Sequence, residues 1–210
     1  MLLTQNSKLK KSGYFNFTLP ALQSTTGLVT CPNAGNCASG CYARMGTYRF
    51  SNVAKKHEAN LQVTLSDDFV SLMITEIRKI HSKNKSIKIR IHDAGDFYSA
   101  EYLEKWILIM NSLKDVEFYA YTKQVEMMLN AKLPNNFRVI FSLGGKQDNM
   151  IDTEKHFHSR VFESIEELTA AGYVDSSEND SVAATTTNNK IGLVYHGAKN
   201  FSNTRWGKVA

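Results

Sequence analysis

Residues 86–92, Ser86-Ile-Lys-Ile-Arg-Ile-His92, alternate strictly between polar and apolar side chains. Because successive side chains of a β-strand point to opposite faces, this pattern predicts a strand with one isoleucine face and one polar face. The polar face carries Lys88, Arg90 and His92. The segment Asp93-Ala-Gly-Asp96 then forms the turn at the carboxyl end of the strand, and Ser99 is placed to cap a helix after it.

The same strand–helix unit recurs on both sides of this segment. Further strands are expected over residues 13–20, 116–122, 137–143, 160–162 and 191–195, and helices over about 52–65, 69–80, 99–113 and 125–129 and after residue 164. Six alternations of strand and helix predict a parallel α/β fold with right-handed crossovers. The polar strand faces suit the inner wall of an open barrel better than a sheet covered on both sides. We therefore expect a partial (β/α)6 barrel with parallel strands.

Length and composition are typical of one globular domain over residues 1–210, with 42% hydrophobic residues. We expect residues 1–12 to form a solvated lead-in and residues 175–189, which are rich in Ser, Thr and Asn, to form a flexible surface loop. No apolar run approaches the roughly 20 residues that cross a bilayer, and no signal peptide precedes the first strand. A cytoplasmic protein without a membrane partner is therefore expected. The net charge of +5 fits either a solvated surface or an anionic partner such as a nucleotide or nucleic acid.

All the cysteines of the chain, Cys31, Cys37 and Cys41, lie in one loop rich in Gly, Asn and Ser. In the reducing cytoplasm, clustered cysteines are more often metal ligands or catalysts than disulfide partners. Three thiolates from one short loop are a ligand set for an iron–sulfur cluster with one position left open. Zinc is the alternative, and its fourth ligand would come from His57, His92 or His196. The third alternative is three unliganded thiols.

Polar side chains also follow the carboxyl ends of the other expected strands. In α/β folds these ends meet at one rim, where ligands bind. We therefore expect a cofactor cavity at this rim that is lined by His92, Asp93, Asp96, Lys123, Ser142 and His196. An alternative interpretation of His92, Asp93 and Asp96 is a site for a divalent metal ion.

Three cysteines in a loop after the first strand of a six-unit array resemble the radical S-adenosylmethionine superfamily. This resemblance implies a radical-SAM-like form of the expected partial (β/α)6 barrel. This resemblance implies that Cys31, Cys37 and Cys41 hold a [4Fe–4S] cluster whose unique iron binds S-adenosylmethionine. The spacing C-x5-C-x3-C and the Asp93-Ala-Gly-Asp96 turn depart from the usual C-x3-C-x2-C and Gly-Gly-Glu-like turn of that superfamily.

Several blocks, spread over nearly the whole chain, also resemble the gene product eighty-eight family of phage and plasmid proteins. They are Thr30-Cys31-Pro32, Cys41-Tyr-Ala-Arg44, Tyr48-Arg49-Phe50, Arg90-Ile-His-Asp-Ala-Gly-Asp-Phe97, Tyr119-Ala-Tyr-Thr-Lys123, Arg160-Val-Phe162 and Gly192-Leu-Val-Tyr-His-Gly197. The second resemblance implies a phage or mobile-element origin, and a host cytoplasm as the location.

Three functional hypotheses follow from these patterns. The first is a phage-type iron–sulfur protein which, as an enzyme, would use S-adenosylmethionine to generate a carbon radical and act on a nucleotide or nucleic acid. The second is a non-catalytic phage effector that uses a structural iron–sulfur or zinc site to bind a host protein or nucleic acid. The third is a divalent-metal hydrolase or nuclease built on His92, Asp93 and Asp96.

Overall fold

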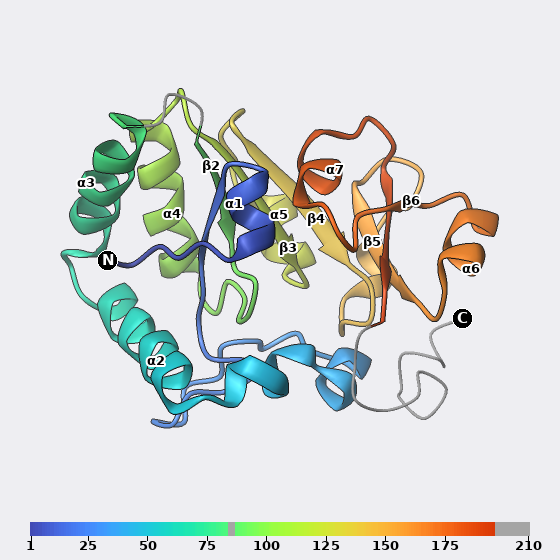
Figure 1. Cartoon of the computed structure of the whole chain (residues 1–210), viewed down its shortest axis with the longest axis horizontal. Coiled ribbons are helices and arrows are strands. Elements are labelled where there is room, and N and C mark those ends of the chain that lie inside the picture. Colours follow the sequence, from blue (N-terminus) through green and yellow to red (C-terminus); the bar gives the residue numbers. More distant parts are fainter. Residues whose placement is uncertain (84–86, 196–210) are drawn as a thin grey trace.

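A computed structural model describes residues 1–83 and 87–195. Seven strands in this part of the chain form one sheet in which every neighbouring pair is parallel. In spatial order they are β1 (Tyr14–Phe17), β2 (Lys88–Ile91), β3 (Glu117–Thr122), β4 (Phe137–Ser142), β5 (His158–Phe162), β7 (Lys190–Val194) and β6 (Val174–Asp175). The sheet curls into a half-barrel (Figure 1), which confirms the expected parallel α/β partial barrel. The two-residue β6, which was not expected, lies beyond β7 at one edge.

Helices and short 3-10 turns connect the strands. The helices are α1 (Ser7–Lys11), α2 (Ser51–Leu65), α3 (Phe69–His81), α4 (Ala100–Ser112), α5 (Val125–Asn130), α6 (Ile165–Ala170) and α7 (Asp180–Thr185). The 3-10 turns are η1 (Asn36–Gly40), η2 (Tyr42–Arg44), η3 (Gly46–Arg49) and η4 (Asp148–Met150). None of the described helices combines the length and the apolar character that crossing a bilayer requires.

The main hydrophobic core lies between the sheet and helices α3 and α4. Ile89 and Ile91 of β2 are fully buried in it, as their alternation with polar residues predicted. Trp106 of α4 is also fully buried, and its ring packs edge-on against Phe17 and Phe69 with centroids 5.5 Å apart in both pairs. With the apolar strand face turned to these helices, the polar face becomes the inner wall of the half-barrel.

This inner wall is partly covered by α1 and α7, which contribute to a second, smaller apolar cluster with Tyr119. Two arginines of the sheet hold α7. Arg90 Nη1 lies 2.8 Å from Asp180 Oδ1, and Arg138 Nη1 donates to the main-chain oxygen of Thr186 at 2.6 Å. The expectation of a flexible loop over residues 175–189 is therefore wrong where α7 forms. A helix of only six residues shows no apolar period in the sequence, and its stability comes from these distant contacts.

Residues 1–12 pack against the fold instead of forming a solvated lead-in. Leu3 and Leu9 are buried, and the N–H groups of Leu2 and Leu3 donate to the Glu76 carboxylate at 2.7 and 2.8 Å. Thr4 also forms an antiparallel bridge to β1. The N-terminal segment therefore covers the free edge of the sheet, which an open barrel would otherwise expose.

Close packing of β7 on α6 gives a test of the fold. A Cβ atom at Gly192 would lie 2.2 Å from Cγ of the buried Leu168. We expect Gly192→Ala to lower the free energy of unfolding by about 1–3 kcal/mol, because the leucine and the helix behind it must move. Urea denaturation followed by circular dichroism measures this change. The double variant Leu168→Ala/Gly192→Ala should lose less stability than the two single variants added together. Strictly additive losses would contradict the packing.

Candidate functional site

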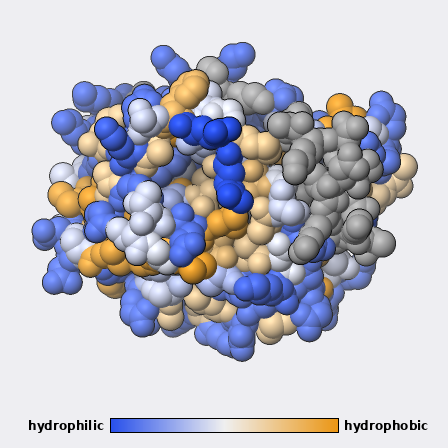
Figure 2. Space-filling model, turned by 90° about the horizontal axis from the view of Figure 1, so that it is seen from below, coloured by the Kyte–Doolittle hydropathy of each residue, from blue (hydrophilic) through white to orange (hydrophobic). Residues whose placement is uncertain are grey.

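A cavity of about 600 Å³ lies at the carboxyl ends of the strands, against the segment that carries the cysteines. This segment runs below the strands in Figure 1 (blue), and Figure 2, which views the molecule from that side, shows apolar surface near the centre of the face with hydrophilic side chains around it. Eight of the nine residues expected at the site line the cavity, namely Cys31, Cys37, Cys41, His92, Asp93, Asp96, Lys123 and Ser142. The ninth, His196, lies outside the described residues.

Main-chain hydrogen bonds fasten the cysteine segment to the ends of the strands. The oxygen of Thr30 accepts from the Asp96 N–H, just after β2, at 2.9 Å. Beyond the end of β4, the oxygen of Gly144 accepts from the Cys37 N–H at 3.3 Å. Gly35 allows this close approach, because a Cβ atom there would lie 2.9 Å from the same oxygen. The thiols are therefore positioned by contacts between backbones.

None of the three cysteines forms a disulfide, and each is partly buried in the cavity wall. Burial raises the pKa of Cys31 to about 12, and the nearby Asp96 carboxylate adds to the rise. Burial also raises the pKa of Cys41. A thiol in such surroundings becomes a thiolate when a positive centre compensates its charge. The site thus has the donor atoms for a metal centre, and the buried Cys31 thiol needs a positive centre to ionise at neutral pH.

Asp93 joins the cysteine segment to the start of the turn after β2. Its carboxylate accepts hydrogen bonds from the hydroxyl of Thr18 and, at 3.0 Å, from that of Tyr48. The Tyr42 hydroxyl donates to its main-chain oxygen. Burial raises the pKa of both tyrosines, so both hydroxyls keep their protons at neutral pH and remain donors. Two aromatic side chains next to the cysteines are thereby held at the cavity wall.

Asp96 is almost completely buried, and protein groups satisfy its carboxylate. Oδ1 accepts from Thr122 Oγ1 at 2.6 Å and from the Phe97 N–H at 2.8 Å, and Oδ2 accepts from the Lys123 N–H at 2.9 Å. Lys123 Nζ donates in turn to Ser142 Oγ at 2.7 Å. Burial raises the pKa of Asp96, and these hydrogen bonds oppose the rise. These contacts connect the carboxyl ends of β2, β3 and β4 to one another.

His92 departs from the alternating pattern of β2. Its backbone φ is +65°, a left-handed conformation that turns the ring out of the polar face. The ring packs against Phe97 with centroids 4.7 Å apart, and Nε2 lies 2.8 Å from the Tyr102 hydroxyl. Burial lowers the pKa of His92 to about 3. The expectation that this ring shares a face with Arg90 is therefore wrong, and His92 stabilises the core beside the cavity.

These contacts bear on the divalent-metal hypothesis for His92, Asp93 and Asp96. The three donor groups are engaged by different protein partners and do not converge. In the part of the chain that the structure describes, no three His, Cys, Asp or Glu side chains are gathered as a single metal ion requires. The geometry therefore does not support a hydrolase or nuclease site built on these three residues.

Comparison with known proteins identifies a family. A family model described as gene product 88 matches residues 1–208. The chain belongs to the gene product 88 family. The Gene 88 proteins of Mycobacterium phage D29 and Mycobacterium phage L5 are each 30% identical to it over 125 residues. These matches cover 54% of this chain and 51% and 52% of the two relatives, so the chain spans about half the length of the curated relatives it matches. No solved structure matches the chain.

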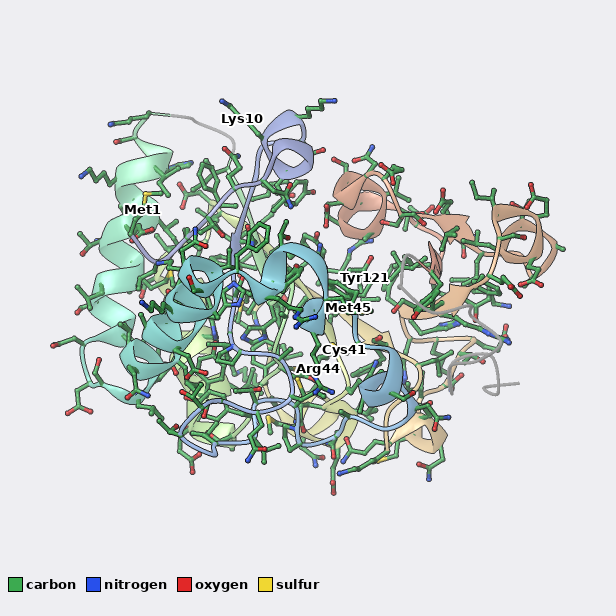
Figure 3. The ribbon with its side chains drawn as sticks, turned by 60° about the horizontal axis from the view of Figure 1, so that its bottom comes forward. Met1, Lys10, Cys41, Arg44, Met45 and Tyr121 are labelled. Atoms are coloured by element: carbon green, nitrogen blue, oxygen red, sulfur yellow. The ribbon has the colours of Figure 1, made fainter. Side chains whose placement is uncertain are left out.

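Several residues of this gene product 88 family protein line the cavity without having been predicted as site residues, and three of them contact one another. They are Arg90, Tyr121 and Asp180. The guanidinium carbon of Arg90 lies 5.5 Å from the centroid of the Tyr121 ring, and Asp180 forms its ion pair. Figure 3 shows Tyr121 close to Cys41 and Met45, which also line the cavity. Alternation in β2 and β3 places Arg90 and Tyr121 on the inner wall, whereas Asp180 reaches the cavity only because α7 forms.

The buried His92 ring predicts a loss of stability in mild acid. An unfolded histidine takes up a proton below its usual pKa of about 6.5, whereas the buried ring stays neutral down to about pH 3. Acid therefore favours the unfolded state, and about 2 kcal/mol of unfolding free energy should be lost between about pH 7 and 5. His92→Asn, whose side chain tolerates positive φ, should remove this loss. Urea denaturation at the two pH values measures it, and an unchanged pH dependence in the variant would exclude His92 as the cause.

Proposed function

We propose that this gene product 88 family protein is an iron–sulfur enzyme that uses S-adenosylmethionine in the cytoplasm of a host cell. Cys31, Cys37 and Cys41 would hold a [4Fe–4S] cluster, and the adjoining cavity would take S-adenosylmethionine and part of a substrate. One observation carries the proposal: three free thiols from a single loop line a cavity at the mouth of a parallel half-barrel. Ligands of parallel α/β folds bind at this end of the strands.

The number of cysteines favours a cluster over zinc, because three thiolates with no fourth cysteine in the chain fit a cluster that keeps one position open. A tetrahedral zinc ion, with Zn–S distances of about 2.3 Å, draws its ligands around one point. A cluster binds its thiolates at separate iron atoms, so its ligands stand farther apart. Of the three fourth ligands expected for zinc, His92 packs in the core, and His196 lies outside the described residues. His57 lies beside the cavity-lining Tyr48, with ring centroids 5.8 Å apart, and is the candidate that zinc would use.

The cavity has the size and the charges that S-adenosylmethionine needs. Its volume of about 600 Å³ falls in the range of roughly 300–1,000 Å³ that is typical of small-molecule sites. S-adenosylmethionine carries an amine, a sulfonium and a carboxylate. The wall contains the carboxylate of Asp93 for the positive groups and the cations of Lys123 and Arg90 for the negative one. The ligand would share these groups with the protein partners that already contact them, such as Tyr48 on Asp93 and Asp180 on Arg90.

The protein's own residues would bind, orient and shield these groups. Main-chain contacts hold the cysteine segment against the strand ends. Tyr42 and Tyr48 are fixed by Asp93 at one wall, and Lys123 is fixed by Ser142 at another. When bound, the cluster and S-adenosylmethionine together supply one-electron chemistry that removes a hydrogen atom from a substrate.

Protein purified without oxygen should contain about four iron and four sulfide ions per chain. Cys37→Ser should remove most of both, because the cluster loses one of three protein ligands. Ser39→Ala is the matched control, since it changes the same loop and leaves every thiol in place. Elemental analysis, sulfide determination and the visible absorption spectrum measure the outcome.

Other outcomes of the metal analysis would contradict the cluster. Zinc without iron would exclude the cluster, and protein without any metal would exclude a metal centre at the cysteines. A Cys37→Ala variant that loses its fold together with its metal would indicate a structural centre. That result would favour the non-catalytic effector that binds a host protein or nucleic acid.

The cluster-loaded protein is expected to bind S-adenosylmethionine in isothermal titration calorimetry. Affinity should fall at least about ten-fold in Cys37→Ser, because the open iron position is lost with the cluster, and should be unchanged in Ser39→Ala. If the cluster-loaded protein binds no S-adenosylmethionine, the proposed enzyme activity is refuted, whereas the proposed iron–sulfur centre is not.

A further inference from the structure

The positive charge of the chain is concentrated in its first 57 residues. This part contains seven Lys or Arg residues and no Asp or Glu, which leaves 18 basic and 20 acidic residues for positions 58–210. The net charge of +5 therefore combines +7 from the first part with −2 from the rest. Lys8, Lys10 and Lys11 lie in α1, and Figure 3 shows Lys10 far from Cys41. The charge near the cysteine segment therefore comes from the four cations that follow it in the chain.

Three of these basic residues are exposed in or just after the segment that lines the cavity. Residues 45–48 line it, and the exposed Arg44 and Arg49 flank them. Lys55 is exposed in the second turn of α2, which begins soon after Arg49. Within residues 1–83 and 87–195, no carboxylate forms an ion pair with any of the three. Figure 3 shows Arg44 beside Cys41 on this side of the molecule.

Two exposed aromatic rings stand among these cations. Tyr42 is 48% exposed and Phe50 is 59% exposed. The Tyr42 ring packs edge-on against Tyr48 with centroids 5.7 Å apart, and its hydroxyl is bonded to the main chain of Asp93. The ring is thus held in place while much of its surface remains open to a ligand. We call Tyr42, Arg44, Arg49, Phe50 and Lys55 the cavity rim.

We propose that the cavity rim binds a single-stranded nucleic acid and that one of its nucleotides enters the cavity. Exposed cations bind phosphates, and exposed aromatic rings stack on unpaired bases, which is how proteins bind single strands. The bases of a duplex are already stacked on one another, and an acidic peptide offers nothing to stack on the rings. A cavity of about 600 Å³ accommodates one nucleotide that is turned out of the strand.

This inference names the substrate class of the proposed enzyme, and it rests on the proposed function only for the nucleotide inside the cavity. The rim contains no cysteine, so its binding can be measured without turnover and with or without iron. If the protein lacks iron but binds nucleic acid through the cavity rim, the proposed iron–sulfur enzyme is refuted and the proposed nucleic-acid surface is supported.

The test is fluorescence anisotropy of the full chain with single strands of about 20 nucleotides, one of DNA and one of RNA. With three cations at the rim, log affinity should fall with log salt at a slope of about −2. Arg44→Gln/Arg49→Gln/Lys55→Gln should weaken binding at least about ten-fold and flatten this slope. Phe50→Ala should weaken binding about five-fold or more through lost stacking. The two strands show whether DNA or RNA is preferred.

Arg78→Gln/Lys79→Gln/Lys83→Gln is the matched control. It removes three charges from exposed positions at the end of α3 and just after it, at the opposite end of the strands (Figure 1). This variant should bind like the unchanged protein, and thermal unfolding checks that all variants are folded. Equal losses in both triple variants, no binding at low salt, or equally tight binding of a duplex would overturn the proposal. Tighter binding of polyglutamate would also overturn it and would indicate an acidic protein partner.

Discussion

The buried carboxylate of Asp96 holds together the end of the half-barrel where the cavity lies. It accepts hydrogen bonds from the side chain of Thr122 and the backbone of Lys123, so it joins the turn after β2 to the end of β3. Its own N–H binds the oxygen of Thr30, directly before the first cysteine. A buried carboxylate is costly unless such donors surround it. The contacts of Asp96 therefore depend on the alignment of β2 with β3, and they help to position the segment that carries the thiols.

A second constraint comes from the polar inner wall of the sheet. Arg90 and Arg138 extend from β2 and β4 into the half-barrel, where both guanidinium groups contact protein partners. The short helix α7 meets both of them, through the Asp180 carboxylate and the main-chain oxygens at its carboxyl end. One side of the sheet is thus stabilised by burial of apolar residues, and the other by a small number of directional polar contacts.

The sequence predicts those features of the fold that depend on residues close to one another in the chain. The alternation around Ile89 and Arg90 shows which face of the strand is buried, and repeated strand–helix units imply parallel pairing. Residues that follow strands in the sequence meet at one rim for the same reason, which is why Asp93, Asp96 and Lys123 were expected near Cys31. The orientation of His92 depends on a positive φ, and α7 depends on distant arginines. Neither cause leaves a pattern in neighbouring residues.

The way in which α7 is attached has a consequence for the evolution of the fold. Residues 176–189 connect β6 to β7 and contribute Asp180, Ser176 and Ser177 to the base of the cavity. The first two residues of the connection are bonded to β7, where the Ser176 N–H donates to the Gly192 oxygen and the Val194 N–H donates to Ser177 Oγ. The helical part, α7, pairs with no strand, so an insertion or deletion there leaves the β5–β7 ladder intact. Such a change would alter the contacts of α7 with Arg90 and Arg138 and the part of the cavity wall that Asp180 forms. Proteins that share this scaffold can therefore diverge toward larger or smaller ligands while the sulfur-bearing loop stays where it is.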